Sequence, residues 1–138
     1  MNPLNMYRET SIKTAGQGRL IVLLYDEAIK NLDKAIAILE AENKQYDKAN
    51  NAIIKAQDII TELSASLDFE KGKDIASNLF SLYVYFNRQL TMGNMDKDSK
   101  PLKPVRNMLY DLRSAWKQIE NTKEVASDKG SVGVDIAG

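Results

Sequence analysis

The 138-residue chain has 19 basic and 19 acidic residues, 43% hydrophobic residues, and neither histidine nor cysteine. Zero net charge argues against a nucleic-acid-binding protein, which normally carries a basic excess. The missing residue types exclude thiolate chemistry, disulfides and histidine-based catalysis or metal binding, so we expect no enzyme activity, cofactor or metal site.

The longest fully apolar run, Leu20–Tyr25, is far shorter than the roughly 20 residues that a membrane span needs. Residues 1–10 include Glu9 and lack the hydrophobic segment of a secretory signal. The absence of cysteine also fits a reducing compartment. We therefore expect a cytoplasmic protein that does not insert into a membrane.

The first 17 residues lack helical periodicity and contain Pro3, with Gly16 and Gly18 at the end. This composition predicts an extended N-terminal arm that ends in a turn. Tyr7 and Ile12 are apolar side chains by which such an arm can dock onto the rest of the chain.

Residues 18–40 are predicted to form the first helix, because apolar residues recur at steps of three and four. Within it, Leu20–Tyr25 is apolar on every helical face, and a helix of that kind needs cover on all sides. Either the arm or a partner protein must supply that cover.

The second helix is predicted over residues 46–67, where seven apolar residues from Tyr46 to Leu67 step by three and four. Asp68 is the predicted N-cap of the third helix, residues 72–92, whose buried face we expect to include Ile75, Leu79, Leu82, Phe86 and Leu90. Gly93 and Asn94 are expected to end this helix.

Pro101 suits the first turn of a fourth helix, residues 101–124, and the glycine-rich residues 127–138 are predicted to be a flexible tail. Four helices joined by short loops predict an all-α, antiparallel up-down four-helix bundle. We expect residues 1–126 to be one domain.

Three polar patterns have ordinary explanations. Residues 96–99 resemble half of a calcium loop but lack its glycine and bidentate acid, so a solvated turn is expected. Asp26 and Glu27 point about 100° apart on a helix and cannot serve one reacting atom. A basic stripe on the fourth helix is best explained by charge pairing within the bundle or by solvation, and comprises Lys103, Arg106, Arg113 and Lys117.

The first and third helices both carry more apolar surface than a single buried face requires, which favours a groove for a partner segment. A thick core is the alternative. The candidate partner-binding residues are Tyr7, Thr10, Ile12, Leu20, Leu23, Leu24, Tyr25, Phe80 and Tyr83.

Three segments resemble the flagellar secretion chaperones of the FliS family. They are the arm and Leu-Tyr-Asp helix at Tyr7–Ile29, the motif Leu67–Gly72, and the leucine and tryptophan segment Leu109–Trp116. The chain departs from the family at 16–18, where a proline-containing turn is common, and at Glu27, where glycine is common.

The resemblance implies a helical bundle that binds the disordered C-terminal segment of flagellin, prevents its premature polymerisation and delivers it to the flagellar type III export gate. It also implies that the arm lies over the apolar groove and moves aside on binding. The expected state is a monomer or weak dimer. The alternative function is a non-catalytic oligomerisation or adaptor module, in which the apolar surface joins copies of the chain.

Overall fold

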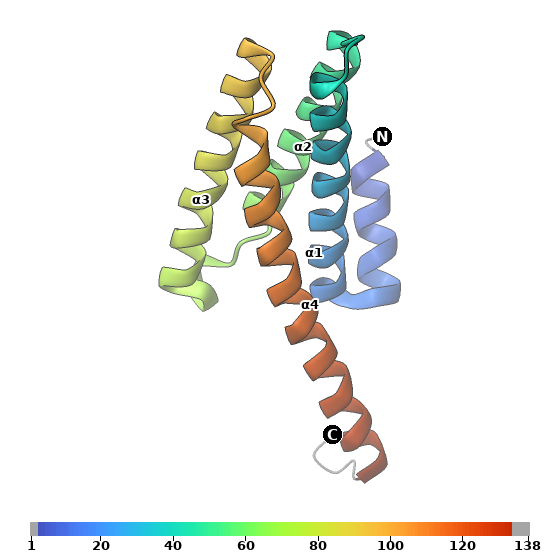
Figure 1. Cartoon of the computed structure of the whole chain (residues 1–138). Helices are drawn as coiled ribbons and strands as arrows, with labels where there is room; N and C mark the ends of the chain where they lie inside the picture. Colours follow the sequence, from blue (N-terminus) through green and yellow to red (C-terminus); the bar gives the residue numbers. More distant parts are fainter. Residues whose placement is uncertain (1–2, 134–138) are drawn as a thin grey trace. The chain divides into compact units, whose positions relative to one another are not determined.

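Four α-helices make up the regular structure of residues 3–133. The computed structural model describes the backbone of residues 3–133 and the side chains of residues 17–122. The helices are α1 (Pro3–Glu40), α2 (Tyr46–Ala65), α3 (Phe69–Asp96) and α4 (Leu102–Gly133) (Figure 1). No strand occurs within the described backbone. The predicted all-α fold class is confirmed.

The chain divides into two compact units, residues 24–110 and residues 1–23 with 111–138. Within residues 24–110 the chain reverses direction after α1, α2 and α3, through connections that are a few residues long (Figure 1). Short connections make successive helices antiparallel neighbours, and this unit is the predicted four-helix bundle. The expectation that residues 1–126 form a single domain stays a prediction.

The unit of residues 1–23 and 111–138 contains the beginning of α1 and the end of α4. Its helices approach closely at Gly18, where an added Cβ would collide with the carboxylate of Glu120. Gly18 therefore has a packing role in this unit, and its lack of a side chain leaves room for the glutamate.

The predictions for the two chain ends need correction. Residues 3–17 are helical and belong to α1, so the expected extended conformation is wrong. Pro3 is compatible with a first helical turn because its missing N–H would be unpaired there in any case. At the other end α4 continues to Gly133, past residue 124. The helix includes Gly130, and a glycine inside a helix costs only about 1 kcal/mol relative to alanine, so it does not by itself end the helix. The flexibility of residues 127–138 stays a prediction.

The buried faces of α1 and α2 follow the predicted pattern. The stepped residues of α1, from Leu20 to Leu39, are all buried, as are five of the seven predicted for the second helix. The helix ends at Ala65, so the predicted end at Leu67 is two residues too far. Tyr46 is an error in the prediction, since it is 45% exposed. It is the first residue of α2, and its ring lies at the helix end with the Lys97 ammonium 5.9 Å from its centroid.

The beginning of α3 combines a regular cap with a strained residue. Asp68 is confirmed as the N-cap, and its Oδ1 accepts hydrogen bonds from the backbone N–H groups of Glu70 and Lys71. Lys73 then has φ 45° and ψ −117°, which kinks the helix. The buried line starts after the kink at Ala76, and the expected core residue Ile75 is 70% exposed. The line comprises Ala76, Tyr83, Phe86, Leu90 and Gly93.

Replacing Lys73 with glycine is expected to raise the free energy of unfolding by about 1 kcal/mol, because glycine adopts positive φ without the steric cost of a Cβ. Urea unfolding followed by circular dichroism measures the change. Lys71→Gly, two residues earlier in regular helix, is the matched control and is expected to lower stability. Equal effects at both positions would contradict the strain.

Gly93 does not end α3, contrary to the sequence prediction. The helix continues to Asp96, and Lys97 in the left-handed conformation (φ 53°) is the C-cap. The Asp98 N–H donates back to the Gly93 carbonyl at 3.0 Å, which closes the turn. An added Cβ at Gly93 would collide with Leu102 Cδ1 and lie 3.1 Å from the Asp98 carbonyl oxygen. The glycine is needed because α4 and its preceding loop approach the α3 backbone here.

Gly93→Ala is expected to destabilise the protein by about 1–3 kcal/mol through overpacking, although alanine favours helix formation by about 1 kcal/mol. Thermal and urea unfolding test this. Ser77→Ala, at an exposed position of the same helix, supplies the control for helix propensity and is expected to be neutral or stabilising. A stabilised Gly93→Ala variant would mean that the contact with Leu102 relaxes freely.

Candidate partner-binding surface

The structure divides the nine candidate residues into three groups. Leu20, Leu24, Tyr25 and Tyr83 are buried, each no more than 2% exposed. Leu23 is half-buried, and Phe80 is 44% exposed. The side chains of Tyr7, Thr10 and Ile12 lie outside the described residues. Phe80 is thus the most accessible of the candidates whose side chains are described.

The apolar run Leu20–Tyr25, in the middle of α1, is covered as its composition predicted. Leu20, Ile21, Val22, Leu24 and Tyr25 are all buried, and only Leu23 is partly open. In this structure these side chains belong to the core. Their contact with a partner stays a prediction, and it requires a movement that uncovers them.

Tyr25 on α1 and Tyr83 on α3 share a hydrogen bond between their hydroxyl groups, with an O–O distance of 2.5 Å. Both side chains are buried, so the bond supplies each phenol with a partner in place of water. Burial raises the pKa of Tyr83, because the phenolate would lose its hydration. The Tyr83 phenol therefore has a higher pKa in the folded protein than in the unfolded chain. The stability that the neutral phenol contributes is fully present below the unfolded-state pKa of Tyr83, and it is lost as the pH rises through the folded-state pKa.

Tyr83→Phe is expected to cost about 1 kcal/mol at neutral pH through the lost hydrogen bond. Above about pH 10 the wild type is expected to lose stability faster than the variant, because only in the wild type does unfolding expose this phenol and let it ionise, which favours the unfolded state. Urea unfolding at pH 7–11 for both proteins gives the difference. A difference that does not shrink with rising pH would contradict the assignment to Tyr83.

The outer surface of α3 is rich in apolar side chains, as the sequence predicted. Phe80, Val84 and Tyr85 are exposed, and so are Met92 and Met95 near the end of the helix. Phe69 packs edge-on against Phe80, with 6.0 Å between the ring centroids. These residues flank the buried line of α3, so they are not consumed by the core of the bundle.

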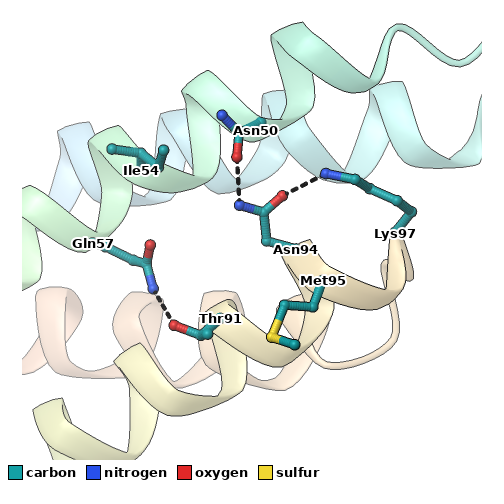
Figure 2. Close-up of a pocket in the computed structure, with 7 residues that line it drawn as sticks. All are labelled: Asn50, Ile54, Gln57, Thr91, Asn94, Met95 and Lys97. Carbon is teal, nitrogen blue, oxygen red and sulfur yellow. Dashed lines mark hydrogen bonds between the residues drawn. The ribbon is translucent and has the colours of Figure 1, made fainter.

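A cleft of about 490 Å³ lies between α2 and α3. Its lining combines amide and hydroxyl side chains with two exposed apolar residues, Ile54 and Met95 (Figure 2). We call it the amide cleft, and it is lined by Asn50, Ile54, Gln57, Thr91, Asn94, Met95 and Lys97.

Hydrogen bonds across the amide cleft join the two helices. Gln57 Nε2 donates to Thr91 Oγ1 at 2.9 Å and to the Asn87 carbonyl at 3.1 Å. Asn94 Nδ2 donates to Asn50 Oδ1 at 2.7 Å, and Asn94 Oδ1 accepts from the Lys97 ammonium (Figure 2). These bonds fix which residues of α2 lie opposite which residues of α3 along the two helices. No pattern in the sequence predicts this cleft, because isolated amides on a helix surface carry no periodic signal.

The basic stripe of α4 is partly neutralised by acidic residues of α1. Lys103 pairs with Glu40 at 2.5 Å, and Arg106 pairs with Asp33 at 2.8 Å. The Lys103 ammonium and the Ser99 hydroxyl hold the pKa of Glu40 below its usual value. Arg106 also lies over the Tyr110 ring. For these two basic residues, charge pairing within the bundle explains the stripe.

The loop that resembled half of a calcium site makes local contacts. Asp98 Oδ1 accepts the backbone N–H of Lys100 at 3.0 Å, and Ser99 donates to Glu40 at 2.9 Å. Among the described residues there is no group of three or more side chains that could hold a metal ion. Within the residues that the structure describes, no helix is long and apolar enough to cross a membrane.

Comparison with known proteins identifies the family. The family model of the flagellar protein FliS matches residues 1–123. The chain belongs to the FliS family. A flagellar secretion chaperone of Bacillus subtilis is 32% identical over 117 residues, which cover 85% of each chain. The corresponding protein of Salmonella typhimurium is 37% identical over 112 residues, covering 80% of this chain and 82% of the relative.

Membership of the FliS family confirms the resemblance inferred from the three motifs. Both relatives named above are flagellar secretion chaperones, which supports an export chaperone role for this chain and implies a non-enzymatic function. The matched region, residues 1–123, includes the amide cleft and the apolar face of α3. Both surfaces are therefore parts of the family domain.

Proposed function

We propose that this protein is a cytoplasmic export chaperone that binds the disordered C-terminal segment of flagellin. Binding would prevent premature polymerisation and help to deliver flagellin to the flagellar type III export gate. The observation that carries the proposal is the exposed apolar face of α3, which includes Phe80, Val84 and Tyr85, on a chain of the FliS family. Such a face suits amphipathic segments that fold on binding.

The proposed binding set keeps the nine residues predicted from the sequence, with different roles for its members. Phe80 is accessible and is proposed to contact flagellin first. Leu20, Leu24 and Tyr25 are buried and would contact it only after a rearrangement. Tyr7, Thr10 and Ile12 are proposed to act in that rearrangement, as the segment that moves aside.

Self-association is the competing use of an exposed apolar face. Analytical ultracentrifugation separates the two functions. A monomer or weak dimer that forms a one-to-one complex with a flagellin segment supports the chaperone. A tight dimer that excludes the segment supports an oligomerisation module.

Calorimetric titration with a flagellin C-terminal peptide is expected to give binding with a clearly negative heat-capacity change, because coupled folding buries on the order of 1,000–3,000 Å². Phe80→Lys is expected to weaken binding by about tenfold, since it places a charge in an apolar contact. Ser81→Lys, at the next exposed position, is the matched control and should bind as the wild type does.

Circular dichroism must first establish that both variants retain the helical fold. Absence of heat at several temperatures, with a soluble peptide and folded protein, would overturn the proposed function. Equal loss in both variants would instead assign the effect to added charge in general and remove Phe80 from the binding set.

A further inference from the structure

The first turn of α3 is folded back toward the rest of the helix. The kink lies at Lys73, whose φ of 45° and ψ of −117° are not helical. In a continuous helix Phe69 and Phe80 would be about 16.5 Å apart along the axis, a gap that two phenylalanine side chains cannot close. Their ring centroids are 6.0 Å apart, edge to face. The kink therefore makes this aromatic contact possible.

Gly72 gives independent evidence of the folded-back turn. In a regular helix, Cβ atoms four residues apart lie about 5–6 Å from each other. A Cβ added at Gly72 would lie only 2.9 Å from the Cβ of Ala76. The kinked conformation therefore requires glycine at this position, whereas a straight helix would accept a side chain.

The kinked conformation is strained at one residue and weakly held by the others. Lys73 has a positive φ, which a residue with a Cβ adopts only at a steric cost. The contact that opposes this cost joins two rings that are each nearly half exposed, Phe69 and Phe80. No residue from 64 to 75 is buried, so core packing does not fix the beginning of α3. Strain balanced by one surface contact is a property of segments that change conformation.

The connection between α2 and α3 can follow such a change. The Ser66 N–H donates to the Glu62 carbonyl at 3.1 Å, and the Leu67 N–H donates to the Ser64 carbonyl at 3.2 Å. Both bonds are local, and neither side chain is buried. Three connecting residues, 66–68, span up to about 10 Å when extended, which gives the first turn of α3 room to move.

We propose that the first turn of α3, residues 69–72, is a lid with two conformations and that Lys73 is its hinge. In the closed conformation, seen in the structure, Phe69 covers one edge of Phe80. In the open conformation Lys73 is helical, α3 is straight from Phe69 onward, and this edge of Phe80 is uncovered. The inference rests on the proposed function, in which Phe80 contacts flagellin, and adds to it a control of access to that residue.

Spin labels at two exposed positions of α3 measure the conformation. The chain contains no cysteine, so Glu70→Cys combined with Arg88→Cys gives a single labelled pair. A straight helix separates these residues by five turns, about 27 Å, and the kink shortens this distance. Pulsed electron paramagnetic resonance is expected to show the shorter distance in the free protein. A flagellin C-terminal peptide is expected to increase the population with the longer distance.

Two neighbouring substitutions are expected to shift the lid in opposite directions. Lys73→Gly removes the strain and favours the closed conformation, so affinity for the peptide should fall by about fivefold. Gly72→Ala adds a Cβ that collides with Ala76 only in the closed conformation, so affinity should rise by about fivefold, and the longer distance should predominate without peptide. Ser77→Gly and Ser77→Ala make matched changes beyond the hinge, and both readouts should stay as in the wild type.

Phe69→Ala distinguishes a lid from a binding contact. Loss of the ring uncovers Phe80 and removes the contact that holds the kink, so the peptide is expected to bind several-fold more tightly. A ring that itself contacts the peptide would give weaker binding on removal. Calorimetric titration measures both affinities, after circular dichroism has established that each variant is helical.

The outcomes separate the lid from the proposed function. Opposite shifts for Lys73→Gly and Gly72→Ala, with tighter binding by Phe69→Ala, support both. One distance common to all variants, or weaker binding by Phe69→Ala, overturns the lid and leaves the chaperone function standing. If the wild type binds no peptide, the chaperone function is overturned. The distances in the free variants then decide the lid: opposite shifts support two conformations of α3, and a single distance overturns them.

Discussion

The bundle depends on α3, because this one helix contacts each of the other three. The hydroxyl of Tyr83 bonds to Tyr25 on α1, and Asn94 and Thr91 bond to side chains of α2. At Gly93 the helix backbone lies against Leu102 of α4. These contacts lie on or beside a narrow buried line, so the rest of the α3 surface stays open. The helix that organises the core therefore also presents the exposed apolar residues.

This double use of α3 limits how its sequence can vary. A larger residue at 93 would push α4 away, and a polar residue at Phe86 or Leu90 would leave an unpaired group in the core. Phe80, Val84 and Met95 are not held by core packing, since each is more than two-fifths exposed. In an isolated chain these apolar residues only raise the risk of aggregation. Their presence is best explained by a partner that covers them.

The amide cleft and the apolar face of α3 differ in the chemistry that they offer to a contacting group. Apolar burial is non-directional and tolerates many sequences, which suits tight but permissive binding. Amides demand a donor or acceptor at a particular place, because a missing partner leaves a desolvated polar group. Under the proposed function, the apolar area of α3 would supply affinity for an export substrate without requiring one particular sequence.

Much of the fold followed from the sequence, because apolar residues at steps of three and four can be buried together only on a helix. That pattern identified the four helices and most of the buried residues of α1 and α2, and the N-cap preference of aspartate identified the Asp68 cap. Family motifs pointed to the export chaperones. The tertiary structure alone decided that Gly93 is a packing residue, that Tyr25 and Tyr83 meet, and that three amides from α2 and α3 line one cleft. Each of these depends on which residues of different helices come together, and the periodicity of a single helix holds no information about its neighbours.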